Sequence, residues 1–345
     1  MYFSSDNSGP VHPEVMEMLA TANTGYALPY GADPLMDEVR DRLRQIFEAP
    51  QAEIYLVATG TAANALALAT LTQPWQTVFC SPVAHIHEDE CNAPEFFTGG
   101  AKLTLVPGDD KMTPDALRQS IIGEENRGVH GPQRGPVSIT QVTERGSIYT
   151  LDELSSLTAV AKEFDLPVHL DGARFANALA RLNCSPAEMS WKIGVDTLCF
   201  GGTKNGLMGV EAVILFNPDN AWEFELRRKR AAHLFSKHRY LSAQMVGYLR
   251  NDLWLRSARQ ANANCKRLVD GLESAGVQLL NSPDANMIYV ALTRAVHQRL
   301  IEAGATFNAD DPAPASNNPD DLLTVRLVCD WSMTDALIDQ FLGYL

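Results

Sequence analysis

The sequence predicts an α/β fold in which a mostly parallel central sheet is covered by helices on both faces, with a smaller α+β domain at the C-terminus. Two observations support this prediction. Short apolar segments typical of buried strands alternate with helical segments along the first two thirds of the chain, and strands that alternate with helices at this spacing form parallel sheets. After about Gly247 this alternation stops and a long helical stretch begins.

The strand segments of the first part are short and apolar throughout, as strands buried on both faces are. Glu53–Ala58 is the clearest example, and the strong helix formers of Thr61–Leu71 follow it. A second helix is expected over Ile86–Phe97, and a third begins at Thr113, whose hydroxyl can cap the helix that Pro114 opens. The remaining strands of the sheet are predicted at 77–80, 102–106, 137–142, 167–170, 195–200 and 210–216.

The part of the chain after residue 247 is predicted to form the smaller domain. Ser257–Ala275 has the pattern of a long helix, and segments typical of a strand, a helix and a strand follow at 286–292, 295–303 and 323–329. The polar, proline-rich segment Asn308–Asp321 is expected to be a loop. We therefore expect an N-terminal arm over 1–20, a large α/β domain over 21–247 and a small domain over 248–345.

Composition excludes several classes of partner. The 345 residues include 28 Lys and Arg against 42 Asp and Glu, a net charge of −14, which repels nucleic-acid backbones. The six cysteines are scattered without a C-x-x-C pair, a pattern that favours a reducing compartment and argues against a structural zinc site. Neither a secretory signal nor an apolar run of about 20 residues is visible. We expect a cytoplasmic protein with no metal, membrane or nucleic-acid partner.

The segment Ala58–Asn64 (ATGTAAN) could bind a phosphate group. A strand ends there, Gly60 permits a tight turn, and a helix opens with the hydroxyl of Thr61 in its first turn. The free N–H groups and positive end of a helix bind anions. An ordinary capped turn explains the segment equally well, and the lysine of a P-loop is missing.

Two further strand ends carry charged residues. Asp171, in the segment His169–Arg174 (HLDGAR), stands where open α/β sheets bind ligands, although a helix cap or a local pair with Arg174 would also account for it. Lys204 follows Gly201-Gly202-Thr203 after another strand. A lysine in a desolvated pocket is a usable amine nucleophile, whereas most loop lysines are simply solvated.

Taken in chain order, a phosphate site, a strand-end carboxylate and a strand-end lysine indicate a site for pyridoxal 5′-phosphate (PLP). In this interpretation Lys204 forms the Schiff base and Asp171 keeps the pyridine nitrogen protonated. The phosphate and ring would be bound by Gly60, Thr61, Thr203 and Arg174.

On these residues the chain resembles the low-specificity L-threonine aldolases, PLP-dependent enzymes of the aspartate aminotransferase fold type (fold type I), over essentially its whole length. The segments that carry the resemblance are Ser5-Asp6-Asn7, Tyr30-Gly31-Ala32-Asp33-Pro34, Ala58–Asn64, Ala84-His85, His169–Arg174, Lys204 and Val325–Val328.

The resemblance implies retro-aldol cleavage of L-threonine, L-allo-threonine and related β-hydroxy-α-amino acids to glycine and an aldehyde. It places His85 over the cofactor ring, and it makes His85 or His130 the candidate for the base that acts on the β-hydroxyl. The residues that it implies for binding the substrate are Ser5, Tyr30, Arg174 and Arg326. It further implies a homotetramer, a dimer of dimers, in which a basic residue of 227–239 reaches the cofactor phosphate of a neighbouring subunit.

Two segments depart from the family pattern, and one of them is Gly201-Gly202-Thr203, which replaces the common Leu-Ser before the lysine but keeps a hydroxyl beside it. The chain has Gln141–Gly146 (QVTERG) where the family usually reads Glu-Asn-Thr-His-Asn-Gly. Other reactions on the same scaffold therefore stay open, namely those of a phenylserine aldolase, another fold type I lyase or an aminotransferase. A cofactor-free α/β binding module is the alternative from a different class.

Overall fold

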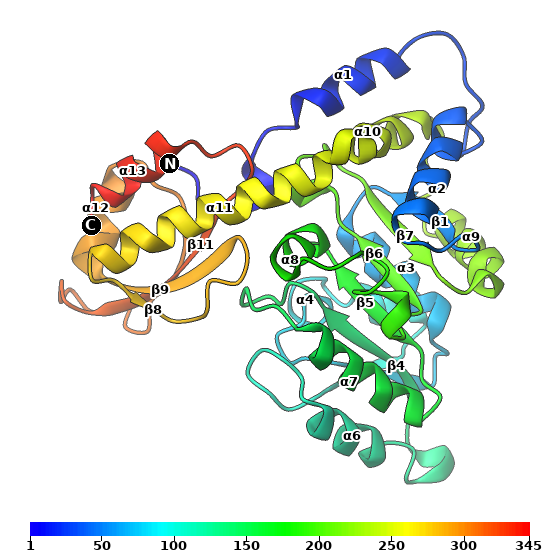
Figure 1. The fold of residues 1–345 in the computed structure, drawn as a ribbon. Helices are drawn as coiled ribbons and strands as arrows, with labels where there is room; N and C mark the ends of the chain where they lie inside the picture. The colour runs from blue at the N-terminus through cyan, green and yellow to red at the C-terminus, as the bar shows by residue number, and fades with distance from the viewer.

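The large sheet has seven strands, and its order along the sheet is β1-β7-β6-β5-β4-β2-β3 (Figure 1). The computed structural model describes all 345 residues. Strand β7 runs antiparallel to both of its neighbours, whereas the pairs from β6 to β3 are all parallel, which confirms the predicted mostly parallel sheet. The strands are β1 (Glu53–Val57), β2 (Gln76–Cys80), β3 (Lys102–Leu105), β4 (Gln133–Thr140), β5 (Val168–Gly172), β6 (Thr197–Phe200) and β7 (Glu211–Leu215).

Helices cover both faces of this sheet. Because successive side chains of a strand point to opposite faces, Ile54 and Leu56 of β1 lie in one apolar core and Tyr55 and Val57 lie in another. The second core is formed with α3 (Gly60–Leu71) and α9 (Ala221–Arg230), and α5 (Ala93–Thr98) packs on α3. The first and larger core is formed with α2 (Pro34–Ile46), α6 (Pro114–Gly123), α7 (Leu151–Glu163), α8 (Phe175–Leu182) and α10 (Arg239–Leu249).

The helix expected over Ile86–Phe97 is interrupted in the structure. It consists of α4 (His85–Glu88) and α5, and between them Cys91 and Asn92 have φ angles of 49° and 61°. These left-handed conformations end a helix, and Pro94 cannot donate a helical hydrogen bond. The expectation of one continuous helix was wrong. The helix-forming residues on both sides of Cys91 and Asn92 concealed the short interruption between them.

The smaller sheet is antiparallel and has four strands in the order β10-β11-β9-β8. Its strands are β8 (Gln278–Leu279), β9 (Met287–Thr293), β10 (Asn308–Asp310) and β11 (Leu322–Val328), and its helices are α11 (Leu253–Ser274), α12 (Arg294–Glu302) and α13 (Asp335–Leu342). The segment Asn308–Asp321 was expected to be a loop, but its first three residues form β10. They do so because they pair with β11. Such pairing depends on a partner that the local sequence does not reveal.

The N-terminal segment and α11 link the two sheets (Figure 1). Phe3 is buried in the core of the smaller sheet, and its backbone bonds to Thr306 and Val328. Helix α1 (Pro13–Ala22) then packs against α10, beside the large sheet. Helix α11 contributes to both cores, and the predicted domain limits stay a prediction. No helix combines the length and the apolar character that crossing a bilayer requires.

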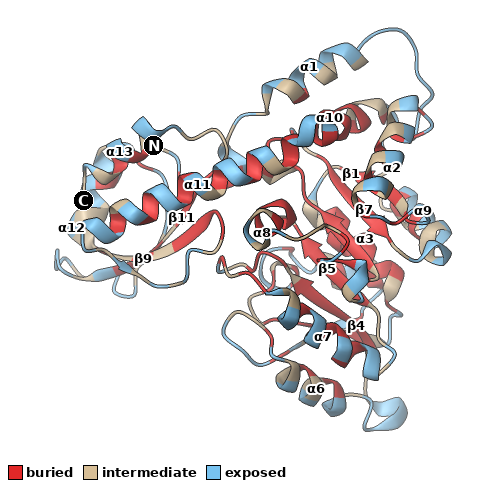
Figure 2. Cartoon of the chain, viewed as in Figure 1, coloured by how far each residue is buried: buried red, intermediate tan, exposed pale blue.

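The end of β6 is held by a cluster of aromatic rings. The ring of Phe200 is fully buried and lies within 6 Å of the rings of Phe47, Phe175, Tyr248 and Trp254. Figure 2 shows β5 and β7, the two neighbours of β6, as buried. This cluster fixes the position from which the chain turns into the glycine-rich segment that follows.

We predict that Phe200→Ala lowers the free energy of unfolding by about 3–5 kcal/mol, because it removes buried contacts and leaves a cavity. Denaturant unfolding of the purified variant measures this change. Phe96→Ala is the matched control, since its ring is 77% exposed and surface substitutions change stability by only about 0.5 kcal/mol. Equal losses in the two variants would contradict the role of the cluster.

Candidate active site

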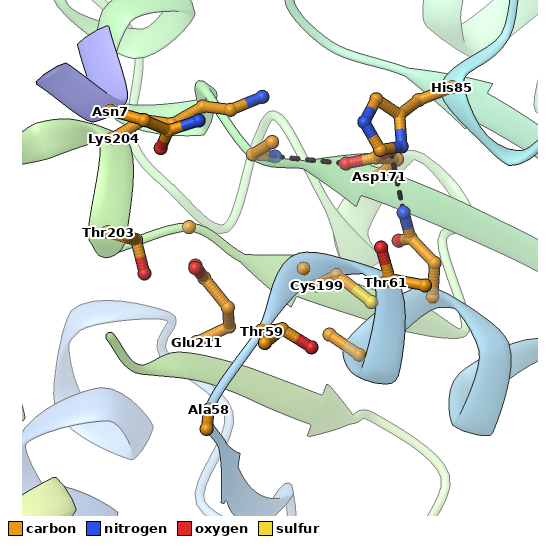
Figure 3. Close-up of a pocket in the computed structure, with 15 residues that line it drawn as sticks. Asn7, Ala58, Thr59, Thr61, His85, Asp171, Cys199, Thr203, Lys204 and Glu211 are labelled. Atoms are coloured by element: carbon orange, nitrogen blue, oxygen red, sulfur yellow. Dashed lines mark hydrogen bonds between the residues drawn. The ribbon is translucent and has the colours of Figure 1, made fainter. Parts of the chain in front are cut away.

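A cavity of about 260 Å³ opens at the carboxyl ends of β5 and β6. Asp171, Lys204 and His85 all line it, together with the start of α3 (Figure 3). Open α/β sheets bind their ligands at this edge, beyond the carboxyl ends of the strands. The structure thus brings together four of the features that the sequence singled out on separate segments.

The first turn of α3 forms one wall of the cavity. Thr59 caps the helix, since its hydroxyl oxygen accepts a hydrogen bond from the N–H of Ala62 at 3.1 Å. Gly60 and Thr61 follow and line the cavity. A Cβ on Gly60 would have no heavy atom within 4 Å, so this position faces open space. The helix N-terminus is therefore accessible to an anion.

Asp171 is buried at the end of β5, and both of its carboxylate oxygens accept hydrogen bonds. The N–H of Ala173 donates to Oδ1 at 3.0 Å, and the amide of Asn64 donates to Oδ2 at 2.9 Å. Asn64 lies one turn into α3. These two bonds fix the orientation of the carboxylate toward the cavity.

The same amide of Asn64 reaches a second carboxylate, which belongs to Glu90. Asn64 Nδ2 lies 2.9 Å from Glu90 Oε1, and Nδ1 of His85 lies 2.8 Å from that same oxygen. The hydrogen bond with Glu90 raises the pKa of His85 above its ordinary value. Burial raises the pKa of Glu90 in turn.

Asn64 and Glu90 were not predicted as site residues. Asn64 ends the predicted phosphate segment Ala58–Asn64, and Glu90 follows His85 by five residues. A carboxylate at that spacing does not share a helix face with the histidine. The turn between α4 and α5 places the Glu90 carboxylate beside His85. No local sequence pattern predicts that turn.

Lys204 lies on a short 3-10 turn, Thr203–Asn205, directly after β6. Its neighbour Asn205 is buried and donates to the hydroxyl of Tyr248 at 2.6 Å and to the carbonyl of Trp254 at 2.8 Å. A Cβ at Gly201 would overlap the carbonyl of Ala173. Glycine is therefore required where this loop passes the Asp171 segment.

Arg174 is paired with Asp6 in a buried ion pair. Its Nε and Nη2 donate to the two carboxylate oxygens of Asp6 at 2.7 and 3.0 Å. Asn286 of the smaller domain also donates to Asp6, at 3.1 Å. The pair therefore links the N-terminal segment to both sheets. Ser5, beside it, caps the 3-10 turn Asp6–Ser8 and accepts from the N–H of Asn7 at 3.1 Å.

Arg326 lies on β11 of the smaller sheet. Its Nη2 donates to the carbonyl of Ser4 at 3.1 Å, whereas its Nε is buried without a partner. A buried guanidinium nitrogen that lacks an acceptor is costly. An anionic ligand is the natural acceptor for such a group.

Comparison with known proteins shows the family. The model of the beta-eliminating lyase family matches residues 3–295. The chain belongs to this family. A low specificity L-threonine aldolase of Pseudomonas aeruginosa is 44% identical over 88% of this chain and 88% of its own length, and one of a Pseudomonas species is 39% identical over 98% and 95%. At this identity and coverage the chain also belongs to the low specificity L-threonine aldolase family.

Solved structures give the same relationship. A threonine aldolase of Leishmania major superposes with a TM-score of 0.92 at 25% identity, covering 99% of this chain and 97% of that chain. The serine palmitoyltransferase of Sphingomonas wittichii, at 18% identity and a TM-score of 0.71 over 100% and 86% of the two chains, shares the fold.

The cofactor of this lyase is PLP, and the cavity suits it. PLP carries an aldehyde, a basic ring nitrogen and a phosphate, which need an amine, a carboxylate and N–H donors. Lys204, Asp171 and the start of α3 offer these three groups around one space. The open space beside Gly60 leaves room for a phosphate.

Five residues predicted for the site do not line the cavity, namely Ser5, Tyr30, His130, Arg174 and Arg326. His130 is exposed on the 3-10 turn Gly128–His130, before β4 begins. Because β4 pairs in parallel with β5 so that Thr140 lies beside Asp171, His130 is at the opposite end of the strand. Tyr30 is 47% exposed and stacks under Lys229, 5.2 Å from its Nζ, and neither His130 nor Tyr30 lines the cavity.

We predict that Glu90→Gln lowers the pKa of His85, because a neutral amide no longer stabilises the imidazolium. An NMR titration of the histidine Cε1 protons measures the change, and loss of one signal in His85→Gln assigns it. Glu88→Gln is the matched control, since Glu88 is exposed on α4. An unchanged His85 titration in Glu90→Gln would contradict this prediction.

Proposed function

We propose that this lyase cleaves L-threonine, L-allo-threonine and related β-hydroxy-α-amino acids to glycine and an aldehyde, using PLP. The observation that carries the proposal is the convergence of Lys204, Asp171 and His85 on one cavity beside the first turn of α3. The names of the Pseudomonas relatives point to the same substrate.

Different residues of the cavity would bind different groups of the cofactor. Lys204 would bind its aldehyde carbon and Asp171 its ring nitrogen, while Gly60, Thr61 and Thr203 would hold its phosphate. When bound, PLP supplies an electron sink for the pair released as a bond to Cα breaks. A carboxylate at the ring nitrogen favours the protonated, electron-poor ring, and the two hydrogen bonds to Asp171 keep it in place.

His85 is the group that we propose as the base for the β-hydroxyl. Its Nδ1 is engaged by Glu90, which leaves Nε2 to accept the hydroxyl proton, directly or through a water. As the proton leaves, the Cα–Cβ bond breaks and the aldehyde departs. Cα then takes up a proton and becomes the methylene of glycine. A raised pKa of His85 means that more of the base is protonated, and hence inactive, as the pH falls.

Arg326 is the group that we propose for the substrate carboxylate, assisted by Ser5 and Arg174. The unpartnered Nε of Arg326 supports this assignment. Arg174 already binds Asp6 through two nitrogens, so its contribution would be to place the N-terminal segment and to add positive charge. Holding the carboxylate fixes which bond of Cα is broken.

We propose that the enzyme works as a homotetramer, a dimer of dimers, in a reducing cytoplasm. Tyr26, Leu28 and Phe235 are exposed on two adjoining segments, which Tyr30 and Ser236 join by a backbone hydrogen bond. A second copy would cover these apolar side chains, and a basic residue of 227–239 would then reach the neighbouring phosphate. All six cysteines are unpaired, and unpaired thiols support the proposal of a reducing compartment.

We predict that Lys204→Ala lowers the rate of glycine and acetaldehyde release from L-threonine by at least about 1,000-fold, since it removes the amine nucleophile. The visible absorbance of the lysine-bound cofactor is lost with it. Lys192→Ala is the matched control, because this lysine lies on the surface beside Glu48. A normal rate in Lys204→Ala would refute the proposed function.

We predict that Arg326→Leu raises KM for L-threonine by about 10- to 100-fold, the value of one hydrogen bond to a charged group. The change in kcat should be smaller, because the carboxylate is bound equally before and during the reaction. Steady-state kinetics with PLP in excess measure both constants. Arg267→Leu serves as control, since Arg267 is exposed and paired with Asp339. A KM of Arg326→Leu equal to that of the wild type would contradict the assignment.

A further inference from the structure

Glu211 places a second carboxyl group inside the cofactor cavity, and the proposed mechanism does not use it. The residue opens β7, is 7% exposed and lines the cavity with Thr203 and Thr59 (Figure 3). The N–H of Gly202 donates to its Oε2 at 2.7 Å. Thr203 is the next residue, and its interaction with the carboxyl lowers the pKa of Glu211, while its hydroxyl accepts a hydrogen bond from the N–H of Val210 at 3.3 Å. Glu211 therefore holds the loop that carries Lys204.

The register of the sheet places this carboxyl beside the phosphate-binding turn. Glu211 pairs with Val57 of β1, and the turn Ala58-Thr59-Gly60 begins at the next residue. A phosphate monoester carries a charge of about −1.5 to −2 near neutral pH. An ionised Glu211 would repel it strongly, because both groups are removed from water.

The groups around Glu211 do not neutralise this repulsion. Lys204 is the one lysine or arginine that lines the cavity, and its amine is the group that binds the aldehyde. The cavity is also lined by Asp171, His85 and Cys199; burial raises the pKa of Cys199 and of Tyr248 on α10, and the charge of Glu211 adds to both shifts. Cys199 and Tyr248 are buried and neutral, and Asp171 is acidic, so none of these three offsets a negative charge.

We infer that Glu211 is protonated whenever the cofactor phosphate is bound, so that binding of the phosphate takes up a proton at this carboxyl group. Its Oε2 keeps the bond from Gly202, and its proton is donated to the hydroxyl of Thr203. That hydroxyl can then direct its own proton to a phosphate oxygen. This inference rests on the proposed function, since it needs PLP in this cavity.

Burial raises the pKa of Glu211 to about 6, although its bonds to Thr203 and Gly202 and the charge of Lys204 oppose the rise. A nearby phosphate raises the pKa of this carboxyl further. Cofactor affinity is then independent of Glu211 below the pKa of the free protein. It falls as the pH rises from that value to the pKa of the complex, because more of the free carboxyl must first be protonated.

The experiment compares the affinity of the wild-type protein and Glu211→Gln for pyridoxamine 5′-phosphate across neutral and mildly alkaline pH. This probe has no aldehyde, so protonation of its bond to Lys204 does not enter. The amide keeps an acceptor for Gly202 and a donor for Thr203 but has no charge. We expect the ratio of the wild-type Kd to the variant Kd to rise by about tenfold or more, one pKa unit of linkage.

The ratio removes the terms that both proteins share. The second ionisation of the phosphate, near pH 6, and any basic side chain from a neighbouring subunit act equally on both. Glu163→Gln, on the surface of α7 beside Arg118, is the matched control and should follow the wild type. Parallel pH profiles for wild type and Glu211→Gln would overturn the inference.

A second measurement uses the wild-type protein alone and holds if the variant fails to fold. Calorimetric titration with pyridoxamine 5′-phosphate in two buffers of different ionisation enthalpy counts the protons taken up on binding. We expect a net uptake of protons at neutral pH, above the second pKa of the phosphate. The absence of this uptake overturns the inference. Failure of the proposed function is distinguishable, because the wild type would then neither bind this probe nor release glycine from L-threonine.

Discussion

The hydrogen bond from Asn64 to Asp171 is the contact on which the rest of the site depends. It joins the first helix after β1 to the end of β5, so the phosphate-binding turn and the carboxylate cannot move independently. Asn64 also binds Glu90, which in turn orients His85. One buried amide therefore fixes three groups of the active site, while Oδ1 of Asn64 and Oε2 of Glu90 stay buried without a partner.

Buried negative charge is the second constraint on this molecule. Asp6, Asp171, Glu90 and Glu211 are all nearly inaccessible to solvent, and each must find a partner or a proton. Asp6 is paired with Arg174, and Asp171 accepts two hydrogen bonds. Glu90 is paired with His85, whereas Glu211 has no such partner and burial raises its pKa to about 6. The aldolase thus combines ion pairing with protonation, and it places the group that would face a phosphate in the second class.

Sequence reasoning succeeded where a functional group belongs to a contiguous segment. The turn at Gly60, the strand end at Asp171 and the loop at Lys204 each combine a strand with a following glycine or hydroxyl, and parallel strands align such ends at one edge. It failed for contacts between distant segments. Arg174 was expected to bind ligands or to pair locally with Asp171, yet it binds Asp6 across 168 residues of sequence. His130 lies before β4, at the end of that strand opposite to Asp171.

The sequence by itself determined the class of fold and the family, and it supplied the residues that we propose to hold PLP, because these follow from local patterns of apolar, glycine and charged residues. Only the tertiary structure decided which carboxyl faces which partner. Glu90 returns to His85 through a break in a helix, and Glu211 reaches Gly202 through the pairing of β7 with β1 and β6. The ionisation of a buried acid depends on the neighbours that the fold supplies, and those neighbours are far apart along the chain.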